Sequence, residues 1–155
     1  MAASVARDVL MRQFRDVQRG TRRLLELIPP ERLDWAPHPG MFTLRQLAGH
    51  LATIGGQTAS GIVLGVWERP HVPEELTRDQ ALERLEASVT RTEELLAQLS
   101  DAEFERREIQ MPWGVTMTVA RAVAALIEHD IHHRTQLFLY LRELGLEVTS
   151  HTLFG

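Results

Sequence analysis

The sequence contains no cysteine. A disulfide, a thiolate metal ligand and a cysteine nucleophile are therefore all excluded. If the protein performs thiol chemistry, the thiol must be supplied by a small molecule. A cysteine-free chain can occur in any compartment, and cytoplasmic residence is the localisation we expect.

Long apolar runs and concentrated positive charge are also missing. No run approaches the roughly 18 apolar residues of a membrane span, and charges interrupt the N-terminal stretch MAASVARDVLMRQFRD, so it has no signal-peptide apolar region. The net charge is −4 and the pI is about 6.0, without a basic stripe of the kind that binds phosphates. We therefore expect neither a membrane nor a nucleic acid as a partner.

What the sequence does contain is helical periodicity. The chain has 155 residues, 44% of them hydrophobic and 25% charged, as in an ordinary globular domain. Apolar residues spaced by three and four predict four helices, and no period-two alternation is long enough to demand a strand. We predict an all-α four-helix bundle forming one domain over residues 1–155. The predicted helices run from about Ser4 to Ile28, Thr43 to Trp67, Thr77 to Leu99 and Thr118 to Leu144.

The ends of these helices carry recognisable signals. Thr43 is a predicted N-cap, and Thr77 with Gln80 forms a capping-box pattern. Gly145 is well placed to follow the last helix. The connections 29–42 and 100–117 are long enough to cross an end of the bundle, so a simple up-down-up-down order is not assured.

The second predicted helix contains four glycines, Gly55, Gly56, Gly61 and Gly65. A glycine inside a helix costs about 1 kcal/mol relative to alanine. We expect a neighbouring helix or a ligand to approach closely here.

The segment EHDIHHRTQL concentrates three of the seven histidines in the last predicted helix. Residues four apart on a helix differ by only about 40° in direction, so His129 and His133 face together at the edge of the apolar stripe. His132 points about 100° away from His133, towards solvent. We expect only the first pair to share a ligand.

His50 occupies a matching edge of the second helix. Each of the three histidines alone fits a core-edge residue hydrogen-bonded to a neighbour. Together they favour a metal site formed by His50, His129 and His133, because burying three imidazoles without a shared partner is costly. Imidazoles suit zinc, nickel, iron or copper better than magnesium or calcium. Three protein ligands leave a position open for water or substrate, as in catalytic zinc sites.

Residues near this cluster have competing interpretations. Asp130 projects into the apolar stripe, where it forms a partly buried ion pair with Arg134 or orients a ligand histidine on another helix. Arg134 and Gln136 are further candidates for supporting the ligands. His38, in a proline-containing loop, is a surface residue, a fourth ligand or a substrate contact. We expect His71 and His151 at the surface. Three aromatic residues either line the mouth of a pocket or, as we prefer, pack at the bundle ends, namely Phe104, Trp67 and Trp113.

Two segments resemble a known family, the DinB-like (damage-inducible, YfiT-type) four-helix bundles. LDWAPHPGMFTLRQLAGHLA resembles that family's loop and capped helix bearing a ligand histidine. EHDIHHRTQLFLYLRELG resembles its signature, a histidine followed three residues later by His-His-Arg-Gly-Gln, with Thr135 in place of the glycine. The resemblance implies a metal triad of His50, His129 and His133, an up-down-down-up topology and a homodimer.

The resemblance also implies a reaction. Relatives include transferases and isomerases that use a low-molecular-weight thiol such as bacillithiol or mycothiol. The first hypothesis is therefore a metal-dependent thiol S-transferase acting on a small-molecule electrophile, with zinc or nickel preferred and iron, manganese or cobalt as alternatives. The second is a hydrolase using a metal-bound water. The third is a stress-related bundle in which the metal only ties two helices together.

Overall fold

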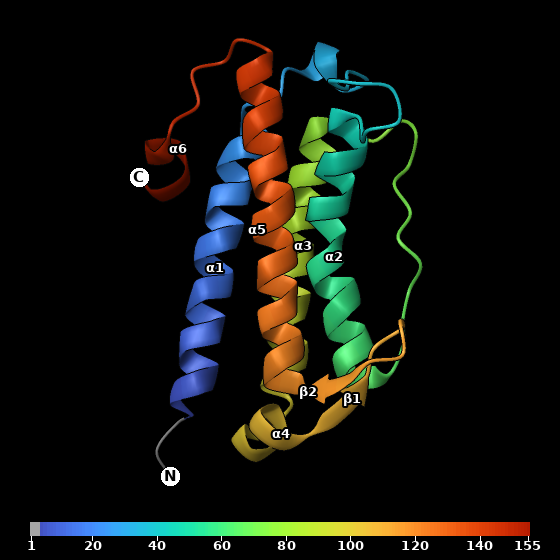
Figure 1. Ribbon diagram of the computed structural model, residues 1–155, viewed down its shortest axis with the longest axis vertical. Coiled ribbons are helices and arrows are strands. Elements are labelled where there is room, and N and C mark those ends of the chain that lie inside the picture. The colour runs from blue at the N-terminus through green and yellow to red at the C-terminus, as the bar shows by residue number, and fades with distance from the viewer. Residues whose placement is uncertain (1–3) are drawn as a thin grey trace.

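Four long helices form the body of the protein in the computed structural model, which describes residues 4–155 (Figure 1). The predicted all-α four-helix bundle is confirmed. The single domain over residues 1–155 stays a prediction, and its first three residues lie outside the described range. The long helices are α1 (Val5–Glu26), α2 (Leu44–Leu64), α3 (Arg78–Ala97) and α5 (Val119–Glu143).

Side-chain caps start these helices where the sequence predicted. Thr43 and Thr77 both form complete capping boxes, and the hydroxyl of Thr118 accepts a hydrogen bond from the Arg121 amide. The second helix ends before the predicted Trp67, because Gly65 adopts a left-handed conformation with φ 71°.

The bundle has an up-down-down-up topology, as the resemblance implied. In Figure 1, α1 and α5 run upwards, whereas α2 and α3 both run downwards. The segments 29–42 and 100–117 stay at the two ends. Because α2 and α3 are parallel, residues 65–77 between them must return along the length of the bundle. An extended residue spans about 3.3 Å, more than twice the roughly 1.5 Å rise of a helical residue, so this segment is long enough.

The sequence did not predict the short elements at the two ends. A helix α4 (Asp101–Arg106) leads into strands β1 (Glu108–Gln110) and β2 (Thr116–Thr118), which pair antiparallel. The sequence pattern demanded no strand, because three-residue strands are too short to show a period of two. A 3₁₀ turn (Pro30–Arg32) follows α1, and a short helix α6 (Ser150–Phe154) lies against α1 at the end of the described chain.

Two groups of buried side chains fill the bundle. One surrounds Leu47 and Leu137, and the other surrounds Phe14 and Val123. The glycines of α2 allow close packing as expected, since a Cβ added at Gly56 would lie 3.2 Å from the Ser88 hydroxyl on α3. None of the helices in the described range is long and apolar enough to cross a membrane.

Candidate metal centre

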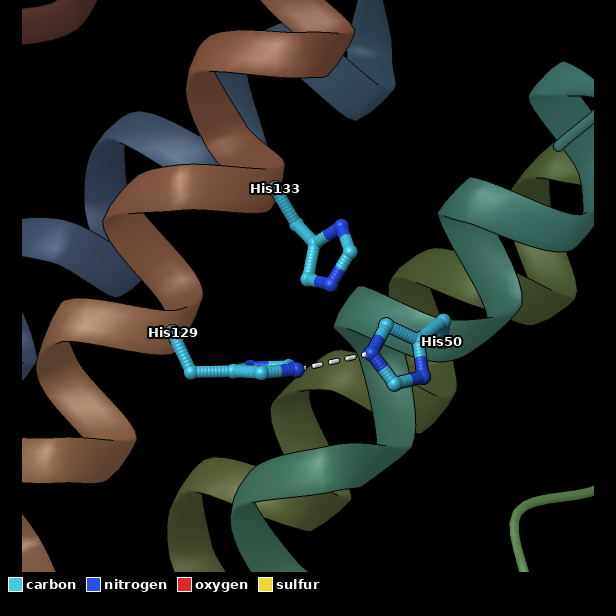
Figure 2. A group of neighbouring side chains, drawn as sticks. All are labelled: His50, His129 and His133. Atoms are coloured by element: carbon cyan, nitrogen blue, oxygen red, sulfur yellow. Dashed lines mark hydrogen bonds between the residues drawn. The ribbon is translucent and has the colours of Figure 1, made fainter. Parts of the chain in front are cut away.

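Three imidazoles face one another between α2 and α5. His50 extends from α2, while His129 and His133 extend one turn apart from α5 (Figure 2). The Nε2 atoms of His50 and His129 are 3.0 Å apart, and the three ring centroids are separated by 4.5 to 4.9 Å. One ring nitrogen from each residue lies within 4.8 Å of the others. The structure thus brings together the three histidines that the sequence selected.

The environment favours the neutral form of these imidazoles. Burial, together with the proximity of His129 and His133, lowers the pKa of His50 to about 4. Burial also lowers the pKa of His133. A neutral imidazole is the form that coordinates a metal, so His50 is ready to bind a cation at neutral pH.

A chain of hydrogen bonds orients His133. Its Nδ1 lies 3.0 Å from the Gln136 side-chain oxygen, and the Gln136 amide nitrogen donates to the Tyr140 hydroxyl at 2.9 Å. The Tyr140 ring in turn packs edge-on against Trp35. Because Nδ1 is occupied, Nε2 of His133 stays available for a ligand. The selection of Gln136 as a supporting residue is consistent with this contact.

Asp130 orients the other ligand candidate on α5. Its side chain is 1% exposed, and Oδ1 lies 3.4 Å from Nδ1 of His129. Its Oδ2 accepts a hydrogen bond of 2.6 Å from Gln18 on α1. The carboxylate therefore contacts a histidine on its own helix rather than on another one.

Arg134 does not take the predicted supporting role. In the described part of the chain it forms no ion pair with Asp130. Its side chain instead turns towards α1 and α6, where its guanidinium lies over the Phe154 ring. Adjacent positions on a helix point about 100° apart, so Arg134 cannot follow His133 towards α2.

The other histidines lie at the surface. His132 is exposed, as expected, although its ring centroid is only 5.1 Å from that of His133. His38, His71 and His151 are exposed as well. His38 is absent from the cluster, so within residues 4–155 the site has three candidate ligands and no fourth.

These donors fit a divalent metal of the borderline type. A tetrahedral zinc with nitrogen ligands at about 2.0–2.1 Å would place those nitrogens roughly 3.3 Å apart, close to the separation of His50 and His129. The absence of carboxylate ligands disfavours magnesium and calcium. The cluster can therefore hold a divalent ion.

A largely apolar cavity of about 520 Å³ opens beside His129. Trp67 and Trp113 line it, which agrees with the alternative of a pocket mouth and not with the preferred packing at the bundle ends. Phe104 does pack as predicted and is fully buried. The β1–β2 hairpin supplies Met111, Pro112 and Trp113, and it closes the end of the cavity between α2 and α5.

Three residues near the site were not identified from the sequence. Phe42 lies 6.0 Å from the His50 ring and covers the cluster from the loop before α2. Gln57 lines the cavity, and its Oε1 is buried without a hydrogen-bond partner in the described chain. Gln18 supports Asp130. A glutamine within the apolar stripe of the first helix was a visible signal for Gln18, whereas Phe42 and Gln57 carried none.

The fold and the cluster define a four-helix bundle with a three-histidine site that could hold a metal. The sequence profile of the DinB superfamily matches residues 13–137, and the chain belongs to this superfamily. YjoA of Bacillus subtilis is 25% identical over 126 residues, which cover 81% of this chain and 82% of that protein.

Two solved structures share the fold. YfiT of Bacillus subtilis, a probable metal-dependent hydrolase with an unusual four-helix bundle topology, is 22% identical with a TM-score of 0.74, covering 94% of this chain and 92% of YfiT. A mycothiol-dependent maleylpyruvate isomerase is 17% identical with a TM-score of 0.61. That match covers 96% of this chain and 65% of the isomerase, which is the longer protein.

Proposed function

We propose that this protein is a metal-dependent transferase that joins a low-molecular-weight thiol to a small electrophile. The observation that carries the proposal is the position of the three-histidine cluster at the wall of an apolar cavity, with His129 belonging to both. The cavity has the size of many small-molecule sites. The mycothiol dependence of the isomerase with this fold supports the thiol.

His50, His129 and His133 would hold the ion. A divalent ion bound there would lower the pKa of a thiol or water at its open position. Gln136 and Asp130 fix two of the imidazole rings through their Nδ1 atoms. The chain contributes no thiol of its own. The nucleophilic sulfur must therefore come from the cosubstrate, for which bacillithiol and mycothiol are the proposed types.

The cavity would select the electrophile. Trp67, Met111 and Leu126 offer an apolar surface that excludes water from the reacting groups. The unpartnered Oε1 of Gln57 would accept a hydrogen bond from an N–H or O–H group of the substrate. We infer an electrophile with an apolar body and one hydrogen-bond donor.

In the proposed reaction the thiol sulfur attacks an electrophilic carbon. A carbon–sulfur bond forms, the bond to the leaving group breaks with its electron pair, and the thiol proton passes to solvent. Hydrolysis is the second candidate, supported by the likeness to YfiT. It needs the same open site, with water in place of the thiol.

Metal content and thiol-dependent turnover test the proposal. The protein is purified without a metal-affinity tag, reconstituted with zinc or nickel, and assayed with monochlorobimane and a panel of small thiols, including bacillithiol and mycothiol. We expect about one metal per chain and chloride release well above the uncatalysed rate. His133→Ala should lose both, whereas Trp67→Ala should mainly raise KM for monochlorobimane.

The controls separate the alternatives. Turnover of a nitrophenyl ester without thiol would favour the hydrolase. Bound metal with neither activity would favour a non-catalytic bundle. Absence of metal after reconstitution would overturn every metal-based function. The homodimer stays a proposal, which sedimentation of the wild-type protein can test.

A further inference from the structure

A second cavity lies on the other side of α5 from the histidine cluster. It has a volume of about 550 Å³ and is bounded by α1, α5 and α6, whose short ribbon is seen beside α1 in Figure 1. Its charged lining residues are three arginines and one carboxylate, namely Arg19, Arg23, Arg134 and Asp16.

Arg134 is the unusual member of this lining. Its relative exposure is 7%, yet within residues 4–155 it forms no ion pair and no hydrogen bond, and its Nε is buried without a partner. The carboxylate of Asp130 attracts this guanidinium at a distance, but it forms no hydrogen bond or ion pair with it in residues 4–155, and its oxygens contact Gln18 and His129 instead. A guanidinium stays protonated when buried, so a charge without a direct hydrogen-bonded partner favours binding of an anion.

The surrounding helices keep this guanidinium open to the cavity. Gly20 on α1 leaves the necessary space, since a Cβ there would lie 2.9 Å from Nη1 of Arg134. Within the described residues Arg23 makes one hydrogen bond, of 3.3 Å, to the backbone oxygen of Leu153. Arg19 pairs with Asp16. Two of the three arginines therefore have no carboxylate partner in the described chain.

We propose that this cavity binds a small amphiphilic anion, with an oxyanion group on a short apolar chain. Arg134 binds the carboxylate or phosphate at the base of the cavity, and Arg23 contacts it from the rim. Val17, Ile131 and Leu153 line the wall against which the apolar chain packs. The site is independent of the proposed metal chemistry, because it lies on another face of α5 and shares no lining residue with the first cavity.

The test is a titration followed by nuclear magnetic resonance. Uniformly ¹⁵N-labelled, zinc-reconstituted protein is titrated with hexanoate, hexyl phosphate and the neutral hexanamide. The backbone amides of Val17 and Ile131 report on the arginine cavity, while the indole N–H signals of Trp67 and Trp113 report on the cavity beside His129. We expect the two anions, but not hexanamide, to shift the first set. The relative affinity of the two anions distinguishes a carboxylate ligand from a phosphate ligand.

Substitutions assign the anion to Arg134. Arg134→Met should weaken binding at the first set of amides by about tenfold or more, because it removes a charged hydrogen-bond donor. Arg23→Gln, at the rim, should weaken it by about twofold to fivefold. Arg84→Met is the matched control, since Arg84 is exposed on α3 and outside the cavity, and it should leave the affinity unchanged.

Three results would overturn the proposal. They are equal shifts from hexanamide and hexanoate, shifts confined to the tryptophan indoles, and unchanged affinity in both Arg134→Met and Arg23→Gln. Because Arg134 is buried, Arg134→Met could unfold the protein. Arg23→Gln then decides the matter alone, since Arg23 is only half-buried at the cavity rim.

Discussion

The two sides of α5 accommodate buried polar groups in opposite ways. Towards α2, burial lowers the pKa of His50 and His133, so these imidazoles lose their charge at neutral pH. Towards α1, Asp130 is shielded by Gln18 and His129, and Arg134 keeps a charge that it cannot release. One helix thus carries neutral metal-ligand candidates on one side and a permanent cation on the other.

Adjacent residues of one helix point about 100° apart, which is enough for their side chains to enter two different environments. His133 and Arg134 are adjacent in sequence, yet one side chain reaches the imidazole cluster and the other reaches the cavity beside α6. Asp130 joins the two sides, because it contacts a ligand candidate and a residue of α1. Substitutions made separately in the histidine cluster and in the arginine cavity test whether the two sites are independent.

The largest effect is expected from the histidine side. His133→Ala should abolish stoichiometric binding of zinc or nickel, whereas His132→Ala should barely change it, because His132 is exposed and outside the cluster. Elemental analysis of both variants beside the wild type measures this difference. Equal losses in the two variants would show that the helix does not separate these neighbours.

The next effect concerns Asp130, the residue between the two sides. Asp130→Asn keeps the size but removes the charge that supports Nδ1 of His129, so metal affinity should fall by about 10-fold to 100-fold. Competition with a chelator of known affinity measures the change. Thr90→Ala is the control, because Thr90 is an exposed residue of α3. An unchanged affinity in Asp130→Asn would mean that the Asp130 carboxylate does not support His129 as a ligand.

A smaller effect is expected from the wall of the apolar cavity. A Cβ at Gly61 would lie 2.1 Å from the Trp67 ring, so Gly61→Ala should displace that tryptophan and destabilise the fold by about 1–3 kcal/mol. Urea denaturation and a red shift of tryptophan fluorescence measure the two consequences. Gly40→Ala is unsuitable as a control because Gly40 has a positive φ. Ala87→Gly, at an exposed position of α3, replaces it and tests helix propensity alone.

The smallest effect is a pH dependence of opposite sign on the two sides. In metal-free protein, the unfolded chain binds a proton at His50 near pH 6.5 while the folded protein resists until about pH 4, so His50 lowers stability as the pH falls through this window. Burial raises the pKa of Asp130, so the folded protein takes up that proton first and gains stability as the pH falls.

Variants can separate these two contributions. His50→Gln should lessen the loss of stability between pH 7 and pH 5, and Asp130→Asn should remove the opposing gain in stability that protonation of this carboxylate provides as the pH falls. Urea midpoints of the metal-free proteins at the two pH values provide the measurement. If His50→Gln leaves the loss unchanged, burial of that imidazole does not govern acid sensitivity.

The sequence was sufficient for the helices and for the facing of His129 and His133 because both depend on local periodicity, whereas His50 was added from its matching helix edge and from the family resemblance. Facing of His129 and His133 follows from a 3.6-residue repeat, and the caps at Thr43 and Thr77 depend on residues three positions away. Such features need no knowledge of distant contacts.

The cavities were missed because their walls come from separate parts of the chain. Trp67 reaches the apolar cavity only because α2 stops at Gly65, and Trp113 reaches it only because a three-residue hairpin forms. The destination of Arg134 depended on α6, a short helix without a strong sequence pattern. Periodicity places a side chain on a face of its helix but does not say which distant segment covers that face.

The distance along the chain between the imidazoles has a mechanical consequence. His50 and His129 are 79 positions apart, so an ion held by both would act as a reversible cross-link closing a long loop. By the chain-entropy relation for disulfides, closing such a loop removes about 4–5 kcal/mol of freedom from the unfolded chain. Bound metal would then raise the free energy of unfolding of the protein, in addition to any role in the reaction.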